Sequence, residues 1–194
     1  MILQAVEKFR DFSDLAAFRR FLSRTRFILG GGFFALLLYH AHPGPGLFWL
    51  ASSVSITGEL IQVWAASSLE KNTVFHPRGP YVLVRNPMYF GRFFVIGGLL
   101  LLDPHQWLLS LYGIVYFGYI QVRVGGEEDR LRSIFGKPYL EYLERVPRFL
   151  PACLNPYRGY EDLVFFRWQL VIKNREHRNL LGLVAFYALV HWRL

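Results

Sequence analysis

The residues of this sequence best suited to chemistry lie in a loop that three prolines constrain, His76–Gly91. Each proline fixes its own backbone dihedrals and restricts the residue before it, so the loop holds its amides and carbonyls in one arrangement. Its side chains include stacking and hydrogen-bonding groups and a cation that the prolines hold in place: Tyr81, Arg85, Asn86, Met88 and Tyr89. This composition predicts a binding loop. A proline-rich helix entry with interfacial tyrosines and a topology-setting arginine is the structural alternative.

A second group of charged residues, Arg123, Glu127 and Glu128, follows an apolar stretch. Arg123 and Glu127 are four residues apart and share a helix face, where an exposed ion pair contributes about 0.3–0.5 kcal/mol. Next to a preorganised loop, such a carboxylate accepts hydrogen bonds from a ligand's hydroxyl or ammonium groups, and such an arginine holds an anionic group. A solvated helix end is the alternative interpretation.

Glu59 and Gln62 form a third candidate, because they lie three residues apart within an apolar stretch. Polar side chains at membrane depth are costly and usually face a cavity or a partner helix. We expect them on the substrate side of a site. A structural hydrogen bond with a neighbouring helix is the alternative.

The sequence motifs exclude several common kinds of cofactor, nucleotide and metal site. The glycines of Gly30–Gly32 and Gly97–Gly98 lie inside apolar stretches and follow no strand, which indicates close helix packing and not a dinucleotide loop. The sequence contains no P-loop, and its histidines lack HExxH spacing. The lone Cys153 excludes an internal disulfide and a cysteine-rich metal site. We therefore predict no metal.

The elements that must position these residues are apolar helices. Of the 194 residues, 53% are hydrophobic, and they fall in blocks. Most blocks approach the ~20 residues that cross a bilayer. The blocks are Phe27–Ala41, Leu47–Ala66, Tyr89–Leu102, Trp107–Val122 and Leu180–Trp192. We predict an all-α, polytopic membrane helix bundle with about four to five transmembrane helices and a cytosolic helical extension.

The net charge of +8 is distributed unevenly between alternate loops. Lys and Arg gather before residue 27, in the 70–85 loop and from residue 123 to 178, whereas 40–46 and 103–106 carry none. By the positive-inside rule the N-terminus and the charged loops are cytosolic, in an integral multi-pass protein. This sidedness favours membrane topology over nucleic-acid binding.

The chain divides into an interfacial amphipathic segment at 1–26, a membrane core at 27–151, and a connector with a C-terminal segment at 152–194. We do not expect the N-terminal segment to be a cleaved signal peptide, because acidic residues interrupt it. Leu163–Val171 reads as another interfacial helix. Asn174–Arg178 is either a charged flank of the last block or a feature of the substrate side.

The third and fourth blocks form a predicted hairpin, since only a short turn separates them. Pro104 is expected to open the fourth helix, and Glu127–Phe135 to continue it as far as Gly136. Pro138–Arg145 follows as a second short helix. The hairpin brings the proline-rich loop beside Arg123–Glu128, although the two are far apart in the sequence.

The order of motifs resembles the isoprenylcysteine carboxyl methyltransferase and phospholipid methyltransferase superfamily. The matching elements, which extend over Glu59–Pro151, are Gly79-Pro80-Tyr81, Arg85-Asn-Pro-Met-Tyr89-Phe-Gly91, an apolar hairpin, Glu127-Glu128, Phe135-Gly136, Tyr139, Tyr142, Val146-Pro147-Arg148 and Pro151. The resemblance implies an integral membrane enzyme that uses S-adenosyl-L-methionine to methylate a lipophilic acceptor.

The resemblance also implies roles for individual residues. Cofactor-binding positions are Val74, Phe75, His76, Tyr81, Asn86, Pro87, Met88, Tyr89, Glu127 and Glu128. Arg123 matches the catalytic arginine that faces the methyl acceptor, with Glu59 and Gln62 also on the substrate side. Many relatives have histidine where this chain has Asn86 and near Thr73, so histidine chemistry does not carry over.

Carboxyl O-methylation of an isoprenylcysteine-like or other lipid substrate is the function this resemblance implies first. A phospholipid or lipid-amine N-methyltransferase is the alternative within the enzyme class. Outside it, a transporter subunit or assembly factor would use Glu59 and Gln62 to line a path. The expected partners are a lipophilic acceptor and membrane lipid, and the sequence leaves the oligomeric state open.

Overall fold

The computed structural model describes residues 31–70, 75–105, 107–149, 157 and 159–194. The chain forms two compact units, Met1–His40 and Ala41–Leu194. The described part of the first unit is one apolar helix, Gly31–His40. The predicted amphipathic segment 1–26, Val74 and Cys153 lie outside the described residues, so the 1–26, 27–151 and 152–194 divisions stay predictions.

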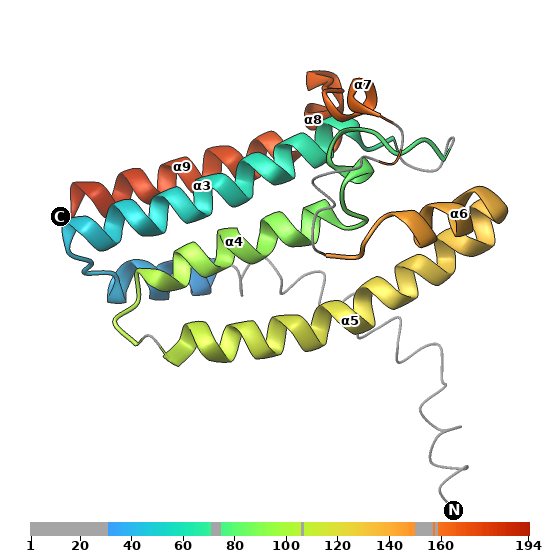
Figure 1. The fold of residues 1–194 in the computed structure, drawn as a ribbon. Helices are drawn as coiled ribbons and strands as arrows, with labels where there is room; N and C mark the ends of the chain where they lie inside the picture. Colours follow the sequence, from blue (N-terminus) through green and yellow to red (C-terminus); the bar gives the residue numbers. More distant parts are fainter. Residues whose placement is uncertain (1–30, 71–74, 106, 150–156, 158) are drawn as a thin grey trace, which may run out of the picture. The chain divides into compact units, whose positions relative to one another are not determined.

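The described residues of the second unit form helices joined by loops and turns (Figure 1). Its elements are α3 (Pro45–Ser68), the short 3₁₀ helix η1 (Gly79–Val82), α4 (Pro87–Leu101), α5 (Trp107–Phe135), α6 (Lys137–Arg145), α7 (Tyr160–Leu163), α8 (Trp168–Lys173) and α9 (Glu176–Trp192). No strand occurs in the described part of the chain, which confirms the all-α prediction.

Two helices, α3 and α5, are long and apolar enough to cross a membrane. With 24 residues, α3 is about 36 Å long, against a hydrocarbon core of about 30 Å. The 15-residue α4 and the helix Gly31–His40 are apolar but shorter. That the protein has about four to five transmembrane helices therefore stays a prediction beyond α3 and α5.

Close backbone contact joins α3 to α4, because glycines replace side chains where the helices meet. A Cβ atom built on Gly58 would lie 2.5 Å from the carbonyl oxygen of Gly91, and one on Gly98 would lie 2.2 Å from Ser55 Oγ. The packing role predicted for Gly98 is thus confirmed. Gly31 and Gly32 show no such contact, since no described atom lies within 4 Å of a Cβ at either position.

Helix α9 runs beside α3 (Figure 1) and is tied to it by polar contacts. The hydroxyls of Ser55 and Tyr187 are 2.8 Å apart. Asn174 Nδ2 donates to the carbonyls of Ala66 and Leu69 at 3.0 and 3.1 Å, at the C-terminal end of α3. Asn174 therefore satisfies carbonyls that a helix end leaves without partners.

The α4–α5 hairpin is present, with one difference from its predicted start. Pro104 lies in the turn, and α5 begins at Trp107. Asp103 Oδ1 accepts a hydrogen bond from the His105 amide at 2.8 Å, and this local bond holds the turn open ahead of the helix.

The extension of α5 as far as Phe135 is confirmed. Gly136 then adopts a φ of +58°, which ends the helix, and α6 follows at the predicted place. The single helix expected over Leu163–Val171 is wrong. The chain forms α7, breaks, and resumes as α8.

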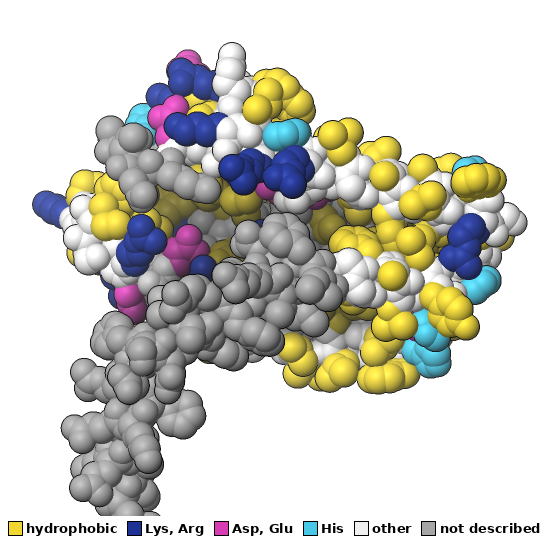
Figure 2. Space-filling view, turned by 180° about the vertical axis from the view of Figure 1, so that it is seen from behind, with side chains coloured by type: hydrophobic (Ala, Val, Ile, Leu, Met, Phe, Trp, Pro, Cys, Tyr) yellow, Lys and Arg dark blue, Asp and Glu magenta, His cyan; other side chains and the backbone are white. Residues whose placement is uncertain are grey.

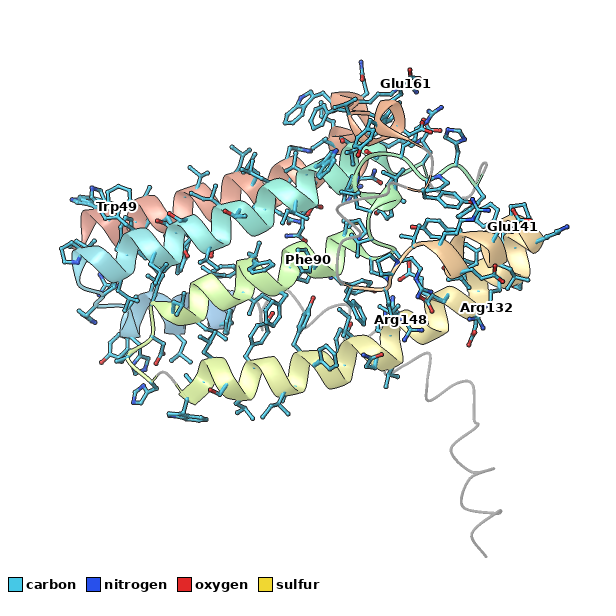
Figure 3. The ribbon with its side chains drawn as sticks, viewed as in Figure 1. Trp49, Phe90, Arg132, Glu141, Arg148 and Glu161 are labelled. Atoms are coloured by element: carbon cyan, nitrogen blue, oxygen red, sulfur yellow. The ribbon has the colours of Figure 1, made fainter. Side chains whose placement is uncertain are left out.

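Charged side chains gather at one end of the second unit. Figure 2 shows most Lys, Arg, Asp and Glu side chains at the end that carries α6 and α7, with hydrophobic side chains dominating the other half. In Figure 3, Trp49 of α3 lies at one end of the unit, and Glu141, Arg132 and Glu161 lie at the opposite end. The charged end is where the proline-rich loop meets α5.

Candidate active site

A cavity of about 420 Å³ lies at the charged end of the second unit. Its wall comes from the end of α3, the proline-rich loop, the start of α4, the last turns of α5, and α6. Phe165, from the segment between α7 and α8, closes one side. Elements far apart in the sequence therefore meet around one space.

The loop has a fixed shape because the rest of the chain holds its backbone. Gly79 has a φ of +58°, and a Cβ there would lie 2.1 Å from Ser68 Oγ, so only glycine fits. The Arg85 amide donates to the Pro147 carbonyl at 2.9 Å. The buried Tyr142 hydroxyl donates to the Tyr81 carbonyl at 2.8 Å. The preorganised loop predicted from its prolines is thus supported by contacts from α6 and the segment after it.

Glu128 is buried, with 3% of its side chain exposed, and two arginines hold it. Arg85 Nη1 donates to Oε1 at 3.0 Å, while Arg148 donates to Oε1 from Nε at 3.2 Å and to Oε2 from Nη2 at 2.5 Å. This contact raises the pKa of Arg148 above its ordinary value. Both carboxylate oxygens are occupied, so Glu128 links the loop, α5 and the segment after α6.

Arg148 makes two further contacts that extend this network. Its Nη1 donates to Gln121 Oε1 at 3.1 Å, and its carbonyl accepts a hydrogen bond from Asn86 Nδ2 at 3.3 Å. Figure 3 shows Arg148 between α5 and the start of α4. The amide of Asn86 is therefore used to fix the loop, a role its residue type allows.

Tyr89 connects α4 to α5 at the cavity, because its hydroxyl donates to Glu127 Oε2 at 3.2 Å. This contact confirms that the hairpin brings the loop beside the end of α5. Arg123 is exposed and interacts with the Tyr89 hydroxyl. The predicted ion pair between Arg123 and Glu127 is not formed. Both side chains meet at Tyr89 instead.

Aromatic rings form one wall of the cavity. The Phe75 ring lies 5.5, 5.3 and 5.1 Å from the rings of Phe135, Tyr139 and Tyr142. Burial raises the pKa of Tyr139 to about 12 and that of Tyr142 well above its ordinary value. The hydroxyls are therefore neutral at physiological pH, and the wall is a flat, uncharged surface suited to stacking.

The structure brings together most of the residues predicted to bind a cofactor. Phe75, His76, Tyr81, Asn86, Pro87, Met88, Tyr89, Glu127 and Glu128 line the cavity. Arg123 borders it through Tyr89. Glu59 and Gln62 do not line it; they are buried in α3, where Gln62 Nε2 donates to Glu59 Oε2 at 3.1 Å.

The cavity is also lined by residues that the predicted set omits, among them Ser68, Arg85, Arg130 and Phe165. The loop pattern already marks Arg85 as a fixed cation, and Tyr139 and Tyr142 lie within the family motifs. Nothing local marks Phe165. It reaches the cavity because its carbonyl accepts a hydrogen bond from Ser68 Oγ at 3.3 Å, at the end of α3.

The fold and the cavity define a class: a helical protein with two potential membrane-spanning helices and a polar, aromatic-walled site at its charged end. Residues 47–138 match the family model described as phospholipid methyltransferase. The protein-S-isoprenylcysteine O-methyltransferase of Schizosaccharomyces pombe is 30% identical over 106 residues, covering 55% of this chain and 45% of the relative. These two matches support the resemblance to the superfamily of isoprenylcysteine carboxyl and phospholipid methyltransferases.

The matched segment spans less than half of that curated relative. No solved structure matches this chain. The two matches and the two apolar helices of the described residues together indicate a membrane protein.

Proposed function

We propose that this protein is an integral membrane enzyme that transfers a methyl group from S-adenosyl-L-methionine to a lipophilic acceptor. The observation that carries the proposal is the cavity itself, where the Tyr81–Tyr89 loop, Glu127 and the aromatic wall converge. The family-model match, residues 47–138, includes the loop and the α4–α5 hairpin. The multi-pass topology, with N-terminus and cavity in the cytosol, is part of the same proposal and rests on the charge distribution.

The residues that line the cavity fit this cofactor by their chemistry. Flat rings at Phe75 and Tyr139 suit an adenine base, Glu127 can accept from ribose hydroxyls or an ammonium group, and Arg85 can face a carboxylate. A cavity of about 420 Å³ is within the size range of small-molecule sites. When bound, the cofactor supplies a methyl group already activated by a sulfonium.

Because the methyl group is activated in advance, the protein's task is positioning. The loop and α4 hold the polar donor, and the cavity walls exclude water from the reacting atoms. We assign Tyr81, Asn86–Tyr89 and Glu127 to cofactor binding, together with Phe75 and His76 of the cavity wall. Val74, which lies outside the described residues, stays a predicted cofactor position. Glu128 acts as a positioning residue, since both its oxygens are bound to arginines.

Arg123 is the candidate for contact with the acceptor. It is exposed, it borders the cavity through Tyr89, and it lies on a helix that is long enough to reach the bilayer. The curated relative is named for methylation of an isoprenylcysteine. Of that activity, we propose for this chain only that the methyl acceptor is lipophilic.

Calorimetry and methyl transfer test the proposal. Detergent-purified full-length protein should give saturable heat with S-adenosylhomocysteine, and tritium from methyl-labelled cofactor should enter a membrane lipid extract. The double variant Glu127→Ala, Tyr89→Phe should lose both signals, whereas Glu144→Gln, at an exposed position of α6, should keep them. Unchanged transfer by the double variant would sink the assignment. Absence of any cofactor heat would favour a transporter subunit or assembly factor.

A further inference from the structure

The arginine and glutamate side chains that line the cavity divide into those with an ion-pair partner and those without one. The paired ones are Glu70 with Arg167, Arg78 with Asp162, and Arg85 with Glu128. Glu127 and Arg130 also line the cavity, but neither forms an ion pair with any residue that the structure describes. One negative and one positive side chain of the cavity wall are therefore available to a ligand.

These two side chains lie close together on α5. Residues three apart are neighbours on a helix surface, and Asp129 and Arg132, at the same spacing, form an exposed ion pair at 3.3 Å. Glu127 and Arg130 do not pair in this way. Glu127 Oε2 instead accepts a hydrogen bond from the Tyr89 hydroxyl at 3.2 Å. Its other oxygen has no donor among the described residues, so it can accept one from a ligand.

A pair of neighbouring opposite charges is complementary to an α-amino acid. At neutral pH such a group carries an ammonium and a carboxylate on the same carbon atom. A guanidinium binds a carboxylate through two parallel N–H donors, and a glutamate accepts hydrogen bonds from an ammonium. The methyl donor that we propose for this cavity ends in a group of this kind.

We propose that Arg130 binds the carboxylate of the cofactor's amino-acid end, and that Glu127 binds its ammonium group. This inference rests on the proposed function and names the residues that recognise one end of the cofactor. It makes Arg130 a specificity-determining residue, because a cofactor without the carboxylate loses this contact. The nucleoside end is then left to the aromatic wall at Phe75 and Tyr139.

Arg85 is the other guanidinium of the cavity that can face a carboxylate, but it is already bound. Its Nη1 donates to Glu128 at 3.0 Å, and its side chain is 16% exposed. A ligand carboxylate at Arg85 would compete with Glu128, which is 3% exposed and has little water to replace the lost donor. Arg130 is exposed and donates to no group among the described residues, so it binds a carboxylate without breaking an existing contact.

A solvated helix end explains only part of this arrangement. A basic residue near the C-terminal end of a helix interacts favourably with the helix dipole, which suits Arg130. The dipole gives no reason for an acid at Glu127, one turn earlier on α5. Arg132, which also stands near this end, pairs with Asp129 and does not line the cavity.

Arg130 is a feature of this chain and not of the motifs that it shares with relatives. It lies within the family-matched segment 47–138. The resemblance, however, rests on Glu127 and Glu128 before it and on Phe135 and Gly136 after it. The carboxylate contact is thus an addition to the shared part of the site.

Two ligands that differ only in the carboxylate test the inference. Calorimetry on the detergent-purified full-length protein compares S-adenosylhomocysteine with its decarboxylated form, S-(5′-adenosyl)-3-thiopropylamine, which keeps the amine and the nucleoside. The wild type should bind S-adenosylhomocysteine about tenfold more tightly, as expected for one charge-assisted contact. Arg130→Gln should lower the affinity for S-adenosylhomocysteine about tenfold and leave that for the decarboxylated ligand unchanged.

Matched variants separate this role from a general effect of charge or stability. Arg132→Gln removes a neighbouring arginine outside the cavity and should keep the wild-type preference. Arg130→Lys keeps the charge without the planar donors and should retain part of it. Glu127→Gln should weaken both amine-bearing ligands and spare 5′-methylthioadenosine, which lacks the amino-acid end.

The same measurements state what overturns the inference. Equal affinity of the wild type for the two ligands, or an unchanged preference in Arg130→Gln, overturns it and leaves the cofactor proposal standing. An equal loss of both ligands in Arg130→Gln also overturns it, because the effect would not depend on the carboxylate. Absence of binding of every adenosyl ligand by the wild type would instead overturn the proposed function.

Discussion

Glu128 and Glu59 are both buried carboxylates of the second unit, but their surroundings are opposite. Glu128 receives hydrogen bonds from two arginines on both oxygens. Glu59 receives one from Gln62 and faces the charge of a second acid. A carboxylate whose oxygens are all satisfied stabilises the fold, whereas a buried one with a free oxygen costs free energy. The comparison therefore separates a positioning acid from a buried acid that the described residues satisfy only in part.

The largest effect is expected at the satisfied acid. Glu128→Gln removes the countercharge of Arg85 and Arg148, and breaking such a buried pair costs about 3 kcal/mol. Chemical unfolding in detergent should show this loss, with weaker S-adenosylhomocysteine binding because the loop loses its anchor. Asp129→Asn, at the neighbouring exposed acid, is the control. Equal stability of the two variants would contradict the distinction between satisfied and free acids.

Gly79→Ala should cost about 2 kcal/mol, because the new methyl group meets Ser68 and the backbone keeps a positive φ. Gly136→Ala provides a matched control: its φ is also +58°, but no atom lies within 4 Å of the new Cβ. Thermal unfolding should show the larger loss at Gly79, and cofactor affinity should fall there only. Equal losses would mean that backbone strain alone acts, and that the loop is not held against α3.

Tyr142→Phe should cost about 1 kcal/mol, the usual loss when one buried hydrogen bond is removed. The lost bond is the one from the Tyr142 hydroxyl to the Tyr81 carbonyl. Tyr160→Phe, at an exposed tyrosine of α7, should change nothing measurable. A fall in S-adenosylhomocysteine affinity together with this loss of stability would show that α6 acts on the loop that Glu128 also positions.

The smallest effect, and one of opposite sign, is expected at the free acid. Glu59→Gln removes a charge that repels Glu176 and has one free oxygen, so the unfolding free energy should stay the same or rise by up to about 1 kcal/mol. Unfolding measured without any ligand checks this. Destabilisation comparable to that of Glu128→Gln would place Glu59 among the structural acids.

The parts of the fold that the sequence predicted well depend on local signals. Gly136 ends α5 and Pro138 stands in the first turn of α6, so both boundaries could be read from neighbouring residues. The hairpin followed from a short turn between apolar blocks. The predicted start of the fourth helix at Pro104 is wrong, because the Asp103 side chain accepts a hydrogen bond from the backbone of the turn and α5 begins only at Trp107.

The remainder depends on contacts between distant residues, which periodicity does not encode. Glu128 becomes a structural acid only because Arg148 arrives from beyond α6. Glu176 reads as part of a charged flank until α9 packs on α3 and buries it. Phe165 reaches the cavity by a backbone contact with Ser68 that no local pattern announces.

Because Phe165 contacts the end of α3 and lines the cavity, the cavity wall extends beyond the segment that the family model matches. The family model ends at residue 138, but the chain returns to the cavity nearly thirty residues later, where the Arg167 amide donates to Ser67 at 3.2 Å and its side chain pairs with Glu70 at 3.3 Å. Two relatives that share the core can therefore differ in the wall that this return supplies. Exchange of C-terminal segments between relatives would change that wall while the matched core stays the same.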